Sequence, residues 1–351
     1  MKKILIAIIL GFSLMLLQAQ ETKLDQTEPL NKKAGRVVKL KKVMTITDKQ
    51  GGFYFRMPGK LSVSSDGSIF FMDMSQLLRF DKKGKLLNNY RKTGQGPGEF
   101  GMMASYVLNG ETLIVLSKMP NKIIWFALDG RLIKEFRIKK FSFGKLLLFR
   151  DSKYYFFKHG IPFVKGKMKI IDVPYSIREF SDGDMAYKNL ITFPVKKYVM
   201  SRGDERRSYS VGKFVAKVYK NRYLIVSHTP EYLIKIYDVA ENRIIRVFSR
   251  KYSRVKSKKK KKTTDNLRPK LKYQNDIRDI LSFQDKVWAI TSTEDPKKGT
   301  LVDVFDHEGS YIDNFYIKFK GKVLGCDERG IFMMEENRKS DFIIVKYKVK
   351  L

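Results

Sequence analysis

A glycine-rich stretch is the clearest candidate for ligand chemistry in this chain of 351 residues. Within TGQGPGEFG, residues Gly96, Gly98 and Gly101 fit the pattern G-x-G-x-x-G, which can cradle the phosphates of a dinucleotide. That use requires a helix that opens at the last glycine. The residues that follow, MMASYVLNGETLIVLS, instead predict strand, turn and strand, and Pro97 removes one backbone donor. The context therefore argues against a phosphate loop.

Polar side chains on several predicted loops form a second group of candidates. Four of them are retained as candidate ligand-binding residues: Asp73, Glu99, His228 and Glu335. Carboxylates and imidazole can bind ligands, but they also satisfy backbone groups at strand ends and in turns. The sequence does not show that they converge. It contains no G-x-S-x-G, H-E-x-x-H or P-loop pattern and no cluster of His, Cys or Asp with the spacing of metal ligands. No catalytic residue is therefore assigned, and the sequence leaves unknown whether a metal binds.

The remaining histidines and the single cysteine have structural interpretations. His159 and His307 stand among turn residues. Cys326 has no identifiable base near it in sequence, which favours a small buried hydrophobic side chain over a reactive thiol. With one cysteine the chain has no internal disulfide framework.

Positive charge is the most unusual feature of the composition. The formal net charge is +35, and such a surface attracts anions. Between Arg250 and Lys272 there are twelve Lys or Arg and one Asp, a net +11. We expect the centre of this segment to contact an anionic surface through a run of five lysines: Lys258, Lys259, Lys260, Lys261 and Lys262. It lacks interleaved aromatic residues, so we expect no specific nucleic-acid binding.

The N-terminus has the pattern of an export signal. Lys2 and Lys3 precede an apolar run from Ile4 to Leu17, and Gln18-Ala19-Gln20 could supply the cleavage site. The sequence predicts an exported protein that is periplasmic or extracellular. If the signal segment is not cleaved, it would anchor the protein to the membrane. No other stretch is long and apolar enough to cross a bilayer.

Short apolar runs separated by turn residues recur along the rest of the chain and predict β-strands. From Lys60 onward, groups of four runs repeat at about 40–50 residues, the length of a propeller blade. The sixth group ends before its fourth strand. Residues Val37–Ile46 precede the first group, and we expect them to supply that strand by pairing with Phe342–Val349.

The repeat predicts an all-β fold, a six-bladed β-propeller of four-stranded antiparallel blades that an N-terminal strand closes by joining the last blade. Residues 1–20 are assigned to a signal peptide, 21–35 to a linker and 36–351 to the propeller, with insertions at about 174–209 and 251–274. In this fold the glycines at 94, 96 and 98 would permit positive φ where the chain crosses between blades, and Phe100 would pack between them.

The same motif carries a family resemblance. GQGPGEF, followed by a strand, an NG turn, a second strand and FALDG, resembles the NHL-type repeat. The chain after its signal segment resembles the bacterial exported six-bladed β-propeller family related to that repeat. The resemblance implies the fold and an exported location, and it implies no activity.

The predicted strand directions place the longer loops on one face and the tight turns on the other. Functional groups concentrate on irregular loops that a rigid scaffold holds, so we expect a monomeric, non-catalytic protein that binds a protein or glycan on the loop-rich face. The alternative is a lactonase-like or lyase-like propeller enzyme with an axial metal site, for Ca²⁺ or another divalent ion. No other cofactor is expected, and composition does not separate the two hypotheses.

Overall fold

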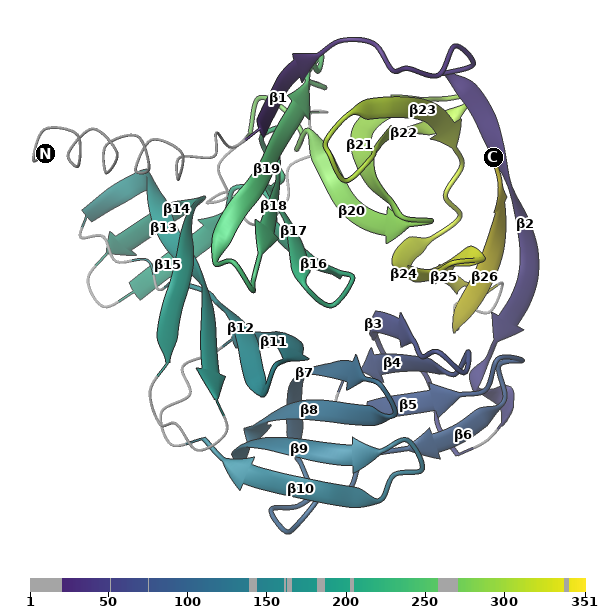
Figure 1. Cartoon of the computed structure of the whole chain (residues 1–351), viewed down its shortest axis with the longest axis vertical. Helices are drawn as coiled ribbons and strands as arrows, with labels where there is room; N and C mark the ends of the chain where they lie inside the picture. Colours follow the sequence, from purple (N-terminus) through teal and green to yellow (C-terminus); the bar gives the residue numbers. More distant parts are fainter. Residues whose placement is uncertain are drawn as a thin grey trace, which may run out of the picture.

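The computed structural model describes residues 21–50, 52–74, 76–138, 144–160, 162, 166–181, 187–202, 205–257, 271–337 and 341–351. The strands form a ring of blades around a central axis (Figure 1). The basic run Lys258–Lys262 and the predicted signal segment lie outside the described residues. Among the described residues, no helix is both long and apolar enough to span a bilayer.

Blades I to III follow one another along the chain, each with its first strand nearest the axis. Blade I contains β3 (Pro58–Val63), β4 (Ile69–Asp73), β5 (Gln76–Phe80) and β6 (Leu86–Asn89). Blade II contains β7 (Met102–Asn109), β8 (Thr112–Met119), β9 (Asn121–Ala127) and β10 (Leu132–Arg137). Blade III contains β11 (Gly144–Arg150), β12 (Lys153–Lys158), β13 (Gly166–Ser181), β14 (Lys188–Arg202) and β15 (Glu205–Ser210).

Blades IV to VI complete the ring. Blade IV contains β16 (Phe214–Tyr219), β17 (Tyr223–His228), β18 (Ile234–Asp238) and β19 (Arg243–Arg250), with β1 (Glu21–Gln26) added at its edge. Blade V contains β20 (Ile277–Phe283), β21 (Lys286–Asp295), β22 (Gly299–Phe305) and β23 (Tyr311–Ile317). Blade VI contains β24 (Lys322–Asp327), β25 (Gly330–Glu336), β26 (Phe342–Lys350) and part of β2 (Arg36–Ile46).

The packing of blades against each other explains the strand sequences. The middle strands of blade II, β8 and β9, are buried over nearly their whole length, because a neighbouring blade covers each of their faces. Their sequences are accordingly continuous apolar runs, whereas the outer strand β10 is exposed or half-buried throughout. The buried residues group into six clusters, and each cluster joins two neighbouring blades.

The N-terminal strand closes the ring, as the sequence predicts. Residues Lys39–Ile46 of β2 pair antiparallel with Ile344–Lys350 of β26 and complete blade VI. The register departs from the prediction at one end, because Arg36–Val38 pair parallel with Phe315–Ile317 of β23 in blade V. A bidentate pair of Arg36 with Asp313, at 2.9 Å for both bonds, holds that end. One strand therefore joins blades V and VI into a single sheet.

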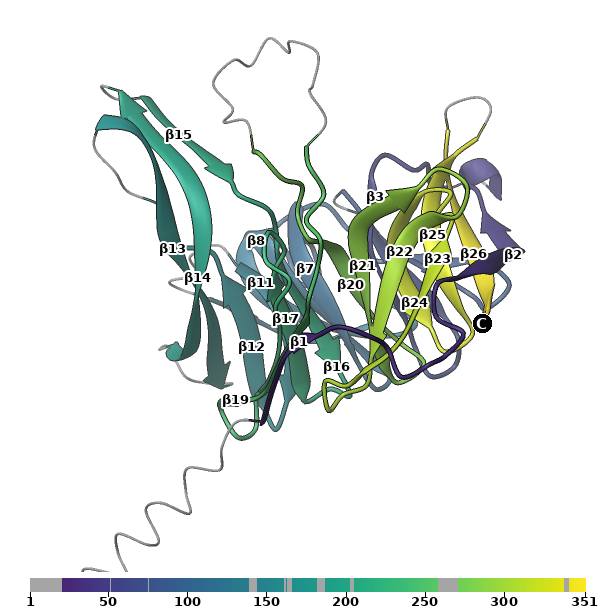
Figure 2. The same cartoon turned by 90° about the horizontal axis from the view of Figure 1, so that it is seen from above.

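The segments assigned to a linker and to insertions contain strands of their own. Residues 21–35 include β1, which pairs parallel with β19. The insertion predicted at 174–209 corresponds to the long hairpin β13–β14 and to β15, which lengthen blade III. Figure 2 shows that these strands rise on the same side of the ring as residues 251–257 and 271–276, which the Lys256–Tyr273 bridge joins. We call this side the loop-rich face.

Removing β2 should destabilise the protein more than removing β1. A chain that begins at residue 47 loses the buried Val38 and Ile46 and exposes the edges of β23 and β26. At about 1.5–3 kcal/mol for each buried aliphatic side chain, we expect a loss of at least about 3 kcal/mol and a sharply lower melting temperature.

The control for this experiment is a chain that begins at residue 36, which keeps β2 and lacks β1, where Lys23 and Gln26 are half-buried and Leu24 and Asp25 are exposed. Both truncations are compared with the parent by thermal and urea unfolding. Equal melting temperatures for the two truncated chains would contradict closure by β2.

Candidate functional site

An axial channel of about 740 Å³ runs through the centre of the ring. The innermost strand of every blade lines it, namely β3, β7, β11, β16, β20 and β24, and Figure 1 shows these strands around the centre. Because each blade contributes its first strand, side chains far apart in sequence face one another across the channel. A concave site lined by several blades is the usual position for a small ligand.

Lysines from three blades dominate the charge of the channel. Lys60 on β3, Lys145 on β11 and Lys217 on β16 line it, with one carboxylate, Asp279 on β20. Lys220, at the turn after β16, also lines the channel, and its Nζ pairs with Asp285 at 3.2 Å. The Nζ atom of Lys217 lies 3.5 Å from Oδ1 of Asp279, and Nζ of Lys60 donates a 2.6 Å hydrogen bond to the backbone oxygen of Tyr106. Lys145 makes no hydrogen bond or ion pair with a described residue. The centre of the channel therefore carries excess positive charge.

The pKa values of these lysines reflect their surroundings. Lys60 is accessible to solvent from within the channel, yet protein surrounds it. This desolvation, together with the charges of Lys217 and Lys145, lowers the pKa of Lys60 to about 8. Desolvation, Lys118 and Lys217 likewise lower the pKa of Lys145. Each cation raises the free energy of its neighbours, and a bound anion would relieve that repulsion.

The donor set of the channel does not fit the divalent ion considered from the sequence. Asp279 is its only carboxylate among the described lining residues, and Ca²⁺ takes six to eight oxygen ligands. Cys326 also lines the channel, but burial raises the pKa of its thiol to about 12 and Sγ donates to the backbone oxygen of Ser282 at 3.0 Å. No group of three or more His, Cys, Asp or Glu within the described part of the chain is placed to hold a metal.

Two of the predicted site residues bind backbone groups of nearby loops. The carboxylate of Asp73 is fully buried and accepts the amides of Arg56 and Met57 at 2.8 and 2.5 Å. Burial raises the pKa of Asp73. Oε2 of Glu99 accepts the amide of Gly96 at 3.0 Å. Both side chains hold irregular segments next to the inner strands.

The other two predicted residues lie in blades IV and VI. Nε2 of His228 lies 2.8 Å from the backbone oxygen of Val211, and burial lowers the pKa of this histidine. His228 lines a small cavity of about 170 Å³ together with Glu231, whose Oε1 lies 2.6 Å from Nζ of Lys196. Glu335 on β25 is half-buried, and its Oε1 has no hydrogen-bond partner among the described residues. None of the four predicted residues lines the axial channel.

The channel lysines were not among the candidates, although the sequence carries a signal for them. The first strands of two repeat units contain Gly-Lys near their start, in GKLSV and GKLLLF, and these lysines are Lys60 and Lys145. In GKFVAKVY the channel lysine is Lys217 and not the lysine of the Gly-Lys pair. In a strand that lines a narrow axis, such a lysine points either into the channel or between blades. Sequence alone does not tell which, because that depends on the register of each strand around the ring.

The glycine-rich loop holds its amides with carboxylates of the protein itself. Gly96 donates to Glu99 and Gly98 donates to Oε2 of Glu135 at 2.8 Å. The buried Lys122 bridges this loop, since its Nζ lies 2.8 Å from both the Gly96 oxygen and Glu135 Oε2. Acids at these amides would repel a phosphate.

The conformation of this loop agrees in part with the sequence prediction. Gly98 has φ of +71°, whereas Gly96 does not have a positive φ. At Gly94 an added Cβ would lie 1.9 Å from Oε2 of Glu99, so close approach also requires glycine there. Phe100 is fully buried in the cluster between blades I and II, as predicted.

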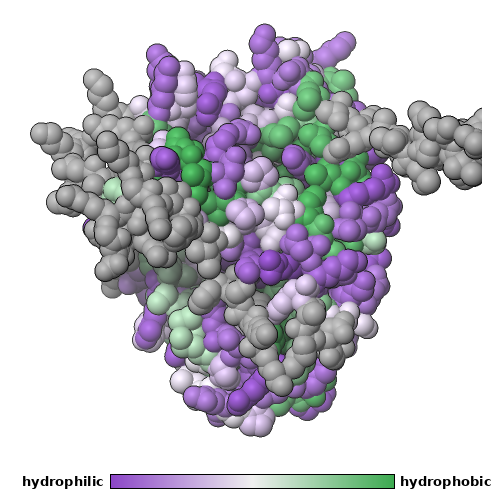
Figure 3. All heavy atoms as spheres, turned by 90° about the vertical axis from the view of Figure 1, so that its left-hand side faces the viewer, coloured by the Kyte–Doolittle hydropathy of each residue, from purple (hydrophilic) through white to green (hydrophobic). Residues whose placement is uncertain are grey.

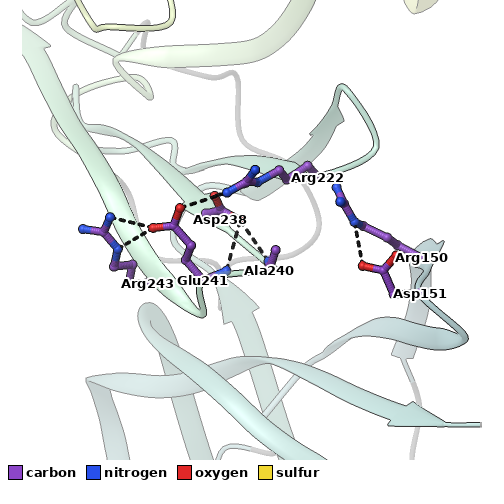
Figure 4. Close-up of polar contacts among 7 residues, drawn as sticks. All are labelled: Arg150, Asp151, Arg222, Asp238, Ala240, Glu241 and Arg243. Atoms are coloured by element: carbon purple, nitrogen blue, oxygen red, sulfur yellow. Dashed lines mark hydrogen bonds and ion pairs between the residues drawn. The ribbon is translucent and has the colours of Figure 1, made fainter.

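Another cavity of about 170 Å³, apart from the one beside His228, lies between blades III and IV. Charged side chains near it form a network with one another. Figure 4 shows Arg222 between the carboxylates of Asp238 and Glu241, with Nη2 at 2.5 and 2.9 Å from them. Arg243 completes this network of ion pairs by pairing with Glu241. These bonds fasten the turns of blade IV to each other, which indicates a structural role.

Large apolar side chains are exposed on the loop-rich face of blades I and II. Five residues are between 43% and 62% exposed: Tyr54, Met57, Met74, Met102 and Met119. We call this group the methionine surface. The Met57 amide bonds to Asp73, which immediately precedes Met74, and Met102 pairs with Met119 across β7 and β8. By contrast, Figure 3 shows the side formed by blades III and IV, where hydrophobic patches alternate with many hydrophilic residues.

Gly98→Ala should lower the free energy of unfolding by about 1 kcal/mol or more, because alanine is strained at positive φ while its Cβ would meet only ordinary contacts. Gly101→Ala is the control, since Gly101 lacks a positive φ and its nearest contact would be 3.4 Å. Urea unfolding measures both. A smaller loss for Gly98→Ala than for Gly101→Ala would contradict the conformational role.

The side chain of Lys60 should lose its proton near pH 8. Below that pH it is charged and faces the cations Lys145 and Lys217, with Asp279 across the channel; above it, the channel has one positive charge fewer. NMR of ¹³Cε-labelled lysine, with Lys60→Gln to assign the signal, measures the midpoint. A titration midpoint of Lys60 near the ordinary lysine pKa of 10.5 would contradict this prediction, because it would show that Lys60 is fully hydrated in the channel.

Comparison with known proteins supports the architecture. Residues 53–220 match a family model described as a 6-bladed beta-propeller. An exported-protein structure from Bacteroides fragilis is 12% identical, with 94% of this chain and 99% of that chain covered and a TM-score of 0.54. No curated protein matches the chain.

Two other solved structures have lower scores. A gluconolactonase from Xanthomonas campestris is 12% identical over 91% of this chain and 96% of its own, with a TM-score of 0.46. The WD40 domain of Pan2 from Neurospora crassa is 8% identical over 92% and 97%, also at 0.46. At 12% identity and a TM-score of 0.54, the likeness to the Bacteroides fragilis structure shows the fold alone. The blade order, the closing strand and the match of the family model to residues 53–220 agree that this chain has the six-bladed β-propeller fold.

Proposed function

We propose that this chain is an exported, non-catalytic binding propeller whose loop-rich face binds a protein partner. The observation that carries the proposal is the methionine surface, where five large apolar side chains are exposed on neighbouring blades of one face. Exposed apolar side chains that gather in one place are typical of interaction sites.

The two halves of the methionine surface are connected through the core. Met103, next to Met102, is buried in the cluster between blades I and II, and Met72, two residues before Met74, packs against the same cluster. The surface therefore rests on a rigid junction, and binding would order few groups apart from the exposed side chains. Rigid support lowers the entropic cost of association.

The composition of this surface favours a protein over a glycan. Four of its five members are methionines, whose unbranched thioethers adapt to varied apolar partners and are enriched at protein interfaces. The guanidinium of Arg56 lies 4.8 Å from the centre of the Tyr54 ring, so an aromatic and a cation stand at its edge. Tyr and Arg are frequent anchors of protein interfaces.

Export is supported by the signal pattern of residues 1–20 and by the likeness to a Bacteroides fragilis protein described as exported. Anchoring by an uncleaved signal segment would keep the propeller at a membrane surface. The alternative of an enzyme with an axial metal has less support, since the channel offers lysines where metal ligands would be needed.

A peptide library displayed on phage tests the proposal. Selection against the parent should yield peptides with apolar side chains. A variant with Met57→Gln, Met102→Gln and Met119→Gln should bind them at least about tenfold more weakly, because these side chains would be central anchors.

The matched control is Leu87→Gln with Ile133→Gln, which removes exposed apolar side chains from the outer strands of the same two blades. It should bind as the parent does. Failure to select any apolar peptide, or equal loss in both variants, would refute the proposed face.

A further inference from the structure

We propose that the axial channel is a binding site for one small polyvalent oxyanion, of the chemical class of sugar phosphates and polycarboxylates. This site is separate from the methionine surface and does not depend on the function proposed for it. Lysines from blades I, III and IV meet in the channel, and they carry the proposal together with the size of the cavity.

The charge balance of the channel is what an anion would complete. Lys60, Lys145 and Lys217 stand against Asp279, so two positive charges remain uncompensated among these four groups. Oδ1 of Asp279 lies 3.5 Å from Nζ of Lys217 and accepts the Ile280 amide at 2.8 Å. Lys145 has no hydrogen-bond or ion-pair partner in the described structure. Ammonium groups held together without counterions are costly, because protein around them reduces the screening by water.

Their place in the channel, and not burial, separates these lysines from the general positive charge of the protein: Lys60 and Lys145 are exposed within the channel and Lys217 is half-buried. Most lysines of this chain lie on the surface, where water and salt weaken their effect on an anion. The channel lysines are held by the first strands of their blades, whose backbones are fixed by pairing and by packing between blades. An anion in the channel would therefore meet preoriented donors in a space of reduced dielectric, where hydrogen bonds to charged groups are strongest.

The dimensions of the cavity limit the ligand. A volume of about 740 Å³ falls within the range of small-molecule pockets. Ser62, Asn109 and Ser282 also line the channel and could bind hydroxyl groups of a sugar or a hydroxy acid. Donors from opposite sides of the ring suit an anion with two or more charged groups.

Isothermal titration calorimetry with inorganic pyrophosphate and with citrate, on the whole exported chain, tests this inference. The parent should bind either probe with a stoichiometry of one. Lys145→Gln should weaken binding by about tenfold, because it removes an unpaired charged donor. Asp279→Asn should strengthen binding by about fivefold, because it removes the opposing carboxylate and can keep the acceptor for the Ile280 amide.

The control Lys82→Gln removes the same charge from an exposed turn of blade I and should leave both affinities within twofold of the parent. Melting temperatures establish that each variant is folded, and Asp279→Asn tests the idea with the opposite sign if Lys145→Gln is unstable. Equal weakening by Lys145→Gln and Lys82→Gln would mean diffuse attraction to the surface. Equal weakening of this kind would overturn the proposal. Weaker binding by Asp279→Asn than by the parent, or no binding of either probe by the parent, would also overturn it.

Discussion

The pairing of β2 with two blades is the interaction on which the rest of this structure depends. Each blade of a propeller buries both of its faces against its neighbours, so an open ring would leave one junction exposed. Here β2 contributes three residues to the edge of blade V and eight to the edge of blade VI, which ties the two ends of the chain together. The inner strands then face one another across a channel of about 740 Å³. Without closure those strands would have no fixed separation.

Closure also explains how unusual charges are tolerated at the axis. Lys60, Lys145 and Lys217 extend from inner strands that also contribute to the apolar clusters between blades, and these six clusters supply the stability that the cations reduce. A cation that protein partly surrounds shifts its pKa or acquires a partner. Lys60 has a lowered pKa and a backbone acceptor, whereas Lys145 has a lowered pKa alone.

The loops on the two faces of the ring differ for a simple geometric reason. The tight turns of one face leave little room for variation, whereas the loops of the other face join blades and can lengthen. In blade III the loops on this face are extended by strands β13–β15, and in blades I and II they expose the methionine surface. Asp73 and Glu99, which the sequence marked as candidate ligands, hold such loops through backbone amides. The polar side chains on this face thus support its shape, while its apolar side chains remain exposed.

The sequence by itself determined the architecture, because a propeller is built from local repeats. Runs such as TLIVLS and KIIWFA predict strands buried on both faces, and the missing last strand pointed to Val37–Ile46 as its substitute. The context of Gly96-Pro97-Gly98 was likewise sufficient to exclude a phosphate loop. Only the tertiary structure decided which side chains meet. Lys60, Lys145 and Lys217 are separated by more than a blade in sequence, and their meeting depends on closure of the ring and on the register of each inner strand, which no local pattern specifies.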